Sequence, residues 1–205
     1  MKHLYLILLV IAVLPLQAQT IYPVETYFEH NDEDNAYFKD VNLIFNKFLG
    51  EWEYSSATEY FKIRFFKVVK EREAARVLTI VRFRDMIKSH LLYRKKINGV
   101  WTDIYNTFPI PGQSSGKIHI SGSRPENFAT MELDYREPYS GNCPNYRSGE
   151  LILAFLVTSE GPKLQWTRTE WTKSSLFFDE PCPDGTPRDA SEFKIPAEMI
   201  LTKVN

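Results

Sequence analysis

The chain has 205 residues, with 25 lysines and arginines against 26 aspartates and glutamates, and 43% of its residues are hydrophobic. This composition excludes a mainly disordered protein, a collagen-like repeat and a disulfide-dense miniprotein. The formal net charge of -1 gives no overall attraction to nucleic acid or to anionic lipid, and the length fits one domain with or without an extension.

The first 18 residues have the three parts of a signal peptide. Met1 to His3 form a short positive start, residues 4–14 are an almost unbroken apolar run, and Ala18 supplies a small residue for cleavage. The apolar stretch is too short for a transmembrane helix, which needs about 20 residues. We therefore predict cleavage after Ala18 and export of a bacterial protein, either to the periplasm or by secretion.

Two segments precede the first strand pattern. Residues 19–37 are rich in acidic and aromatic side chains and are interpreted as an irregular acidic N-terminal arm. Between Phe38 and Phe48 the apolar residues recur at helical spacing, and Gly50 then ends the pattern, which predicts a short amphipathic helix. The predicted organisation is a signal peptide over 1–18, the arm over 19–37 and one globular domain over 38–205.

After Gly50 the hydrophobic pattern changes to the alternation of β-strands. The segments are rich in β-branched and aromatic residues and are bounded by turn residues. Asn98-Gly99 is the strongest hairpin signal, because both residues suit a type I′ turn. Strands in regular succession without helices between them indicate an antiparallel all-β barrel or sandwich. The predicted strands span residues 51–56, 60–69, 76–86, 89–97, 100–106, 117–123, 128–135, 150–158, 163–172 and 193–203.

One predicted strand does not alternate. The residues from Leu151 to Val157 are apolar at seven consecutive positions. A strand with one face in water should alternate, so we expect both faces to be covered. The helix predicted over 38–48 is the expected cover.

Both cysteines, Cys143 and Cys182, lie in loop sequences flanked by proline and other turn residues. Export would place them in an oxidising compartment, where such a pair is expected to form a disulfide. A zinc site built on two cysteines would need histidines at ligand spacing, and none stands near them in the sequence. We predict a disulfide and no metal.

The segment Phe48-Leu49-Gly50-Glu51-Trp52 stands where the predicted helix gives way to the first strand. A Phe-x-Gly-x-Trp at this place resembles the opening motif of lipocalins and their calycin relatives. The resemblance implies a closed barrel of about 8–10 strands, with Trp52 at one end and a basic residue of the last strand across it, here Lys203. Residues 40–204 also resemble a family of small secreted bacterial proteins of unknown function.

Several candidate sites follow from residue types. Aromatic residues on predicted strands are core residues or the lining of a ligand pocket, and the candidates for lining are Phe65, Tyr93, Trp101 and Trp166. His90 and His119 could each act as a general base, but no nucleophile or phosphate-binding motif accompanies them. We therefore favour a non-enzymatic role without a cofactor.

Basic residues concentrate between Lys62 and Lys96. Residues 60–96 hold twelve lysines and arginines against three acids, and they alternate with apolar positions on two strands. This pattern is the outer face of a barrel or a surface that attracts anions, such as glycans or lipid headgroups.

The favoured function is an exported binding protein. Its partner would be a small apolar or amphipathic molecule inside the barrel, or an envelope component at a loop end. The alternative is a structural or interaction protein whose barrel is filled by side chains, and a hydrolase using His90 or His119 comes third. Nucleic acid is not an expected partner, and the ligand and oligomeric state do not follow from the sequence.

Overall fold

The computed structural model describes residues 19–74, 80–109, 118–138, 146–170 and 193–204. The predicted signal peptide and both cysteines of the predicted disulfide, Cys143 and Cys182, lie outside these residues. The elements in chain order are β1 (Ile21–Pro23), η1 (Val24–Thr26), β2 (Tyr37–Lys39), η2 (Ile44–Lys47), β3 (Gly50–Ser55), β4 (Glu59–Ala74), β5 (Val81–Ile97), β6 (Val100–Asn106), β7 (His119–Pro125), β8 (Thr130–Pro138), β9 (Tyr146–Thr158), β10 (Gly161–Glu170) and β11 (Glu198–Lys203).

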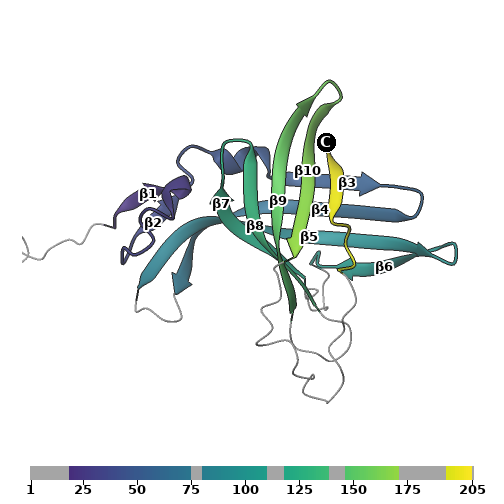
Figure 1. Ribbon diagram of the computed structural model, residues 1–205, viewed down its shortest axis with the longest axis horizontal. Helices are drawn as coiled ribbons and strands as arrows, with labels where there is room; N and C mark the ends of the chain where they lie inside the picture. Colours follow the sequence, from purple (N-terminus) through teal and green to yellow (C-terminus); the bar gives the residue numbers. More distant parts are fainter. Residues whose placement is uncertain (1–18, 75–79, 110–117, 139–145, 171–192, 205) are drawn as a thin grey trace, which may run out of the picture.

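Eight of these strands close into an antiparallel barrel (Figure 1). The ring runs β5-β4-β3-β11-β10-β9-β8-β7, and β7 pairs back onto β5. The last strand, β11, pairs with the first barrel strand, β3, so the ring joins the two ends of the domain. The predicted all-β antiparallel barrel is therefore confirmed.

Strand β5 joins the barrel to its extensions. One edge of β5 pairs with β4 along almost its whole length, whereas the other edge is shared in turn by β2, β7 and β6. The sequence predicted two strands, over 76–86 and 89–97, but β5 is continuous because β4 pairs with it through Ile87 and Lys88. The β5–β6 hairpin extends sideways from the barrel (Figure 1).

The helix predicted over residues 38–48 does not form as such. The segment instead contains the end of β2 and a four-residue 3-10 helix, η2. Leu43 has a left-handed backbone (φ 53°), and the Asp40 carboxylate accepts a hydrogen bond of 2.7 Å from the Ile44 N–H, so the regular helical bonding is interrupted. Among the described residues, no helix is long and apolar enough to cross a membrane.

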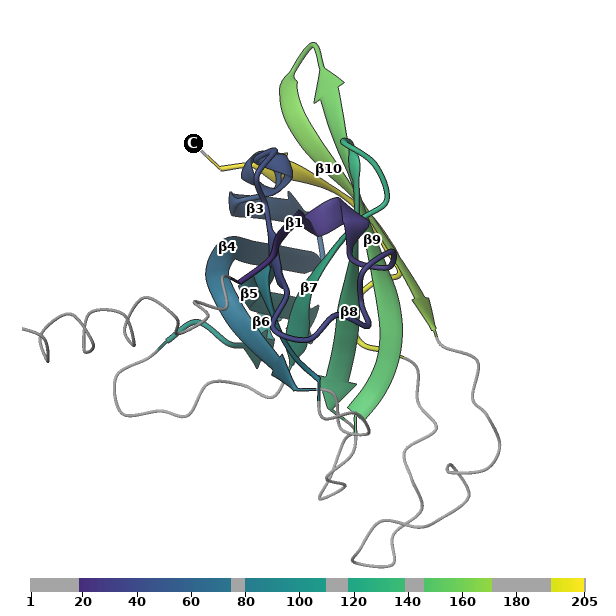
Figure 2. The ribbon, with the colours of Figure 1, turned by 90° about the vertical axis from the view of Figure 1, so that its left-hand side faces the viewer.

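Most of the apolar residues that suggested the helix still enter the core, but Val41 is 46% exposed. Phe38, Phe45 and Phe48 are completely buried, and Ile44 is nearly so. The segment from β1 through η2 lies across one end of the barrel, as the two views show (Figures 1 and 2). These side chains are therefore buried because the segment lies against the barrel end, and a regular helix is not needed to bury them.

The expected cover of the Leu151 to Val157 segment is incomplete: among the described residues, Phe48 packs against Phe155, with ring centres 6.4 Å apart, but other positions of the strand remain accessible. On the outer face Ile152, Ala154 and Leu156 are only partly buried, and on the opposite face of the strand Val157 is 86% exposed. The prediction that both faces are covered is wrong. Strand β8 pairs with β9 only as far as Ala154, so the β9–β10 hairpin continues beyond the barrel wall (Figure 1).

Side chains fill the barrel. The inward-facing positions carry large apolar residues, and those with no surface accessible to a water-sized probe include Trp52, Phe61, Ile63, Tyr93, Met131, Leu133, Tyr135, Leu151, Leu153, Leu164, Trp166 and Leu201. A cavity that could hold water would leave accessible area on the side chains around it. The described interior is therefore a packed core, which is one of the two states an eight-stranded barrel can adopt.

Candidate functional site

The Trp52 end of the barrel brings together the pair that the sequence resemblance implied. Trp52 and Lys203 are direct partners in the β3–β11 register, and the Lys203 ammonium lies 5.2 Å from the centre of the indole ring. The indole N–H donates to the Phe48 carbonyl at 2.8 Å. Gly50 has a φ of 102°, a backbone conformation that a side chain would strain, so the glycine sets the turn into β3.

The candidate lining residues divide into two groups. Phe65, Tyr93 and Trp166 lie inside the barrel and are at most 1% exposed. Trp166 packs edge-on against Phe61, with ring centres 5.2 Å apart. Trp101 does not join them, because it lies on β6, outside the barrel ring, and is 44% exposed.

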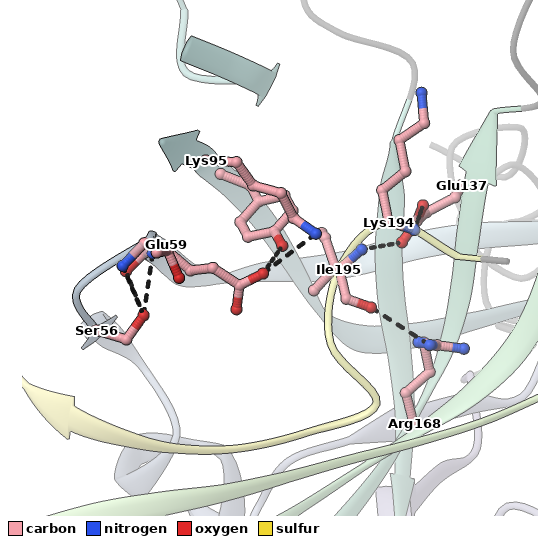
Figure 3. Close-up of polar contacts among 9 residues, drawn as sticks. Ser56, Glu59, Lys95, Glu137, Arg168, Lys194 and Ile195 are labelled. Carbon is pink, nitrogen blue, oxygen red and sulfur yellow. Dashed lines mark hydrogen bonds and ion pairs between the residues drawn. The ribbon is translucent and has the colours of Figure 1, made fainter. Parts of the chain in front are cut away.

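The end of the barrel opposite Trp52 carries buried polar groups. Glu137, at the end of β8, is 1% exposed and accepts four hydrogen bonds. Two come from the backbone N–H groups of Lys194 at 2.9 Å and Ile195 at 3.2 Å, and two from the hydroxyls of Tyr105 and Tyr135. Figure 3 shows Glu137 directed at the chain that leads into β11. The carboxylate therefore fastens this chain to the barrel.

Arg168 of β10 adds a second bond to the same chain. Its guanidinium donates to the Ile195 carbonyl at 3.3 Å and lies 4.0 Å from the ring centre of Phe193 (Figure 3). The Trp166 indole N–H also reaches this chain, donating to the Pro196 carbonyl at 3.2 Å. Two barrel strands, β8 and β10, thus hold residues 193–196 over this end.

Glu59 forms a neighbouring cluster at this end. Its carboxylate accepts a hydrogen bond of 2.8 Å from the Tyr93 hydroxyl and lies 3.1 Å from the Lys95 ammonium (Figure 3). Burial and the hydrogen bond to Glu59 raise the pKa of Tyr93, and burial together with the charge of Glu137 raises the pKa of Tyr135. Both phenols therefore stay protonated and act as hydrogen-bond donors.

The chemistry of this end is structural. Both oxygens of Glu137 and one oxygen of Glu59 accept hydrogen bonds, and the phenol protons of Tyr93, Tyr105 and Tyr135 are donated to these carboxylates. Within the described ranges no group of histidine, cysteine, aspartate and glutamate side chains is arranged to hold a metal ion. The arrangement can close a barrel, but it presents no activated nucleophile.

The two candidate histidines lie apart from this end. His90 is on the outer face of β5, stacked on Phe66 with ring centres 5.0 Å apart and close to Phe108. No carboxylate contacts the His90 ring in the described parts of the chain, so nothing orients it as a general base. The side chain of His119 lies outside what the structure describes.

The basic face between Lys62 and Lys96 is largely neutralised. Glu51 on β3 forms ion pairs with both Lys62 (2.6 Å) and Arg64, and Glu71 pairs with Lys88 at 3.1 Å. Glu51 lies on β3, outside residues 60–96, so the charge count over that range did not include it. Glu71 lies in the C-terminal half of β4 and was counted, but the sequence did not show that it pairs with Lys88. Most of this face is therefore a set of ion pairs rather than a free anion site.

A buried ionic cluster at the other barrel end escaped the sequence analysis. Asp85 is 1% exposed and accepts hydrogen bonds from the Tyr37 hydroxyl (2.6 Å) and from the backbone N–H groups of Asp40 and Lys70, both at 3.1 Å. The Lys67 ammonium lies 3.0 Å from Asp85 and 3.1 Å from Asp40. A charged residue at an inward position of a strand was the available signal. This cluster docks the N-terminal segment on the barrel.

A pH dependence is expected from Glu132 on the outer face of β8, whose side chain is 16% exposed. Burial and a hydrogen bond with Glu150 raise the pKa of Glu132 to about 7, against the opposing charge of Arg124. The folded protein therefore retains a proton on Glu132 that the unfolded chain releases near pH 4.5. The stability that protonated Glu132 contributes is lost as the pH rises through 7. Glu132→Gln should raise the free energy of unfolding by about 1–2 kcal/mol at pH 8 and change it little at pH 4.5. Denaturant titrations at both pH values measure this, and destabilisation at pH 8 would show that the pair with Arg124 dominates.

Comparison with known proteins adds a family and no activity. No curated protein matches the chain, and no solved structure matches it. A family model described as a family of unknown function (DUF6705) matches residues 1–108, which include the Phe-x-Gly-x-Trp segment and the strands from β1 to β6. The match covers more than half of the sequence, and the chain therefore belongs to this family, DUF6705.

Proposed function

We propose that the chain is an exported binding protein that engages an envelope component with its outer surface, not with the barrel interior. The observation that carries this proposal is the packed core of the described residues, in which Trp52, Tyr93 and Trp166 have no surface accessible to water. A ligand-binding barrel needs a concave site that buries most of its ligand. Binding at a strand end or loop end requires no such space.

The Trp52–Lys203 contact and the β3–β11 closure also support a calycin-like ancestry. In the calycin resemblance this pair closes one end of the barrel, and Lys203 covers the indole with its methylene stem. We infer a barrel of calycin type that has exchanged an internal ligand for aromatic side chains.

Export is part of the proposal and has its own measurement. The mature N-terminus should be Gln19 when the full chain is expressed in a bacterial host, because cleavage is expected after Ala18. N-terminal sequencing of the protein from the periplasm or the medium checks this. A protein that keeps Met1 and stays in the cytoplasm would contradict export.

Native mass spectrometry separates binding outside the barrel from binding inside it. The purified protein should show the mass of the chain alone, and it should sediment with a bacterial envelope fraction in a binding assay. A small apolar molecule that co-purifies in a one-to-one ratio would instead favour the internal site. Absence from the envelope fraction would overturn the proposal.

A further inference from the structure

We propose that the tip of the β5–β6 hairpin, residues 94–103, is a membrane-surface element that binds anionic phospholipid. This inference rests on the proposed function and specifies the envelope component. The turn of this tip, from Ile97 to Val100, lies beyond the barrel wall, because the last residue of β5 that pairs with β4 is Lys95 and β6 pairs only with β5 among the described strands (Figure 1).

The first observation is a cluster of exposed apolar side chains at the turn. Ile97 is 47% exposed, Val100 66% and Trp101 44%. The register pairs Ile97 with Val100, and the Asn98-Gly99 turn with positive φ at both residues brings the two strands together. Tryptophan and aliphatic side chains at a projecting turn are the residues that enter the interfacial region of a bilayer.

The second observation is the charge next to that cluster. Arg94, Lys95 and Lys96 precede the turn, and Asp103 is the one acid in residues 94–103, so this segment carries +3 and -1, a net +2, which Glu59 beside Lys95 lowers to +1. Arg94 pairs with Asp103 at 2.6 Å and Lys95 with Glu59 at 3.1 Å. Lys96 is exposed and forms no ion pair within the described part of the chain.

Geometry joins the two observations. Lys96 lies directly opposite Trp101 in the β5–β6 register, so the two side chains start from neighbouring positions on one face, just behind the apolar turn. Lysine at this depth can reach a lipid phosphate while its methylene stem stays with apolar groups. A negative surface attracts such residues, and each one adds about fivefold to binding when it lies near the surface.

An anionic bilayer fits this tip better than a protein strand does. A strand added to the free edge of β6 would use backbone groups and would leave the apolar turn residues in water. The chain as a whole has a formal charge of -1, so an anionic bilayer would not attract the molecule in every orientation. It would attract the molecule only when the basic tip faces the bilayer. The apolar and basic residues on one projecting turn are explained together only by a surface with both properties.

Vesicle sedimentation tests the inference with the protein as it exists. The purified chain should bind phosphatidylcholine vesicles that contain phosphatidylglycerol, bind vesicles of phosphatidylcholine alone at least about fivefold less, and be released by salt. Lys96→Glu and Val100→Ser should each weaken binding to the anionic vesicles about fivefold or more. Trp101→Phe, made in a Trp171→Phe background because Trp171 lies outside the described residues, should remove most of the blue shift in fluorescence on vesicle addition, since Trp52 and Trp166 are buried already.

Phe128→Ser is the matched control. Phe128 is also exposed, at 67%, but it lies in the turn between β7 and β8, so its loss should leave vesicle binding unchanged. Equal weakening by Phe128→Ser, unchanged binding of Lys96→Glu and Val100→Ser, or no binding to anionic vesicles would each overturn the inference. Concentration-dependent dimers that Val100→Ser dissolves would reassign the tip to self-association and likewise overturn it.

The outcomes separate this inference from the proposed function. A chain that sediments with the envelope fraction but not with anionic vesicles retains the proposed function and loses the lipid assignment. A co-purified internal ligand removes the proposed function whatever the vesicles show. Thermal unfolding of each variant confirms that it is folded, which the exposure of the substituted side chains favours.

Discussion

Trp166→Ala should lower the free energy of unfolding by about 3–5 kcal/mol, the cost of removing a large aromatic side chain from a packed core. The indole is completely buried, packs edge-on against Phe61 and Tyr135, and donates a hydrogen bond to Pro196. Its loss would leave a cavity and an unsatisfied carbonyl at the chain that leads into β11. Urea or guanidinium titration followed by circular dichroism measures the change.

Trp101→Ala is the matched control for this experiment. The same substitution on the exposed face of β6 removes little buried surface, so it should cost about 1 kcal/mol or less. A comparable loss from the two variants would mean that the barrel interior is loosely filled. That result would revive an internal ligand site and contradict the packed core.

Asp85→Asn should destabilise the protein by about 3–5 kcal/mol and loosen the N-terminal segment. Removing one partner of a buried ion pair leaves the other charge uncompensated, here Lys67, and the amide cannot accept all the bonds from Tyr37, Asp40 and Lys70. Hydrogen exchange should accelerate most over β2 and the backbone that follows it. Uniform acceleration across the barrel would contradict a docking role.

The same carboxylate sets an acid limit. Burial would raise the pKa of Asp85, but the hydrogen bonds from Tyr37 and Lys67 outweigh it and hold that pKa below the usual 3.8. Its contribution is therefore present above pH 3.8 and is lost as the pH falls below that value. Asp103→Asn, at an exposed pair with Arg94, should cost no more than about 1 kcal/mol and serves as the control.

The barrel could be predicted because its strands alternate. Phe61, Ile63 and Phe65 occupy inward positions of β4, and the residues between them are partly or fully exposed, which is the pattern that period-two hydrophobicity reports. The prediction of a helix over 38–48 was wrong. The spacing of apolar residues indicates which side chains tend to be buried, but it does not determine which backbone hydrogen bonds form. There Asp40 and the left-handed Leu43 decided the backbone.

The polar ends were harder to predict for a different reason. Asp85 and Glu137 stand in line with inward apolar residues of β5 and β8, so a charge at a core position was visible in the sequence. Their donors were not visible, since Tyr37 and Lys194 lie far away in sequence and meet them only after the barrel closes. Long-range partners of this kind follow from topology, which a local pattern does not specify.

The pairing of β3 with β11 also bears on how the chain folds. It joins residues 52 and 203, so loop-closure entropy must be lost over most of the domain before the ring gains its final contacts. Until β11 arrives, β3 and β10 each present an unpaired edge that can recruit a strand from another molecule. A chain that ends before β11 is therefore expected to aggregate, and not to settle into a slightly smaller barrel.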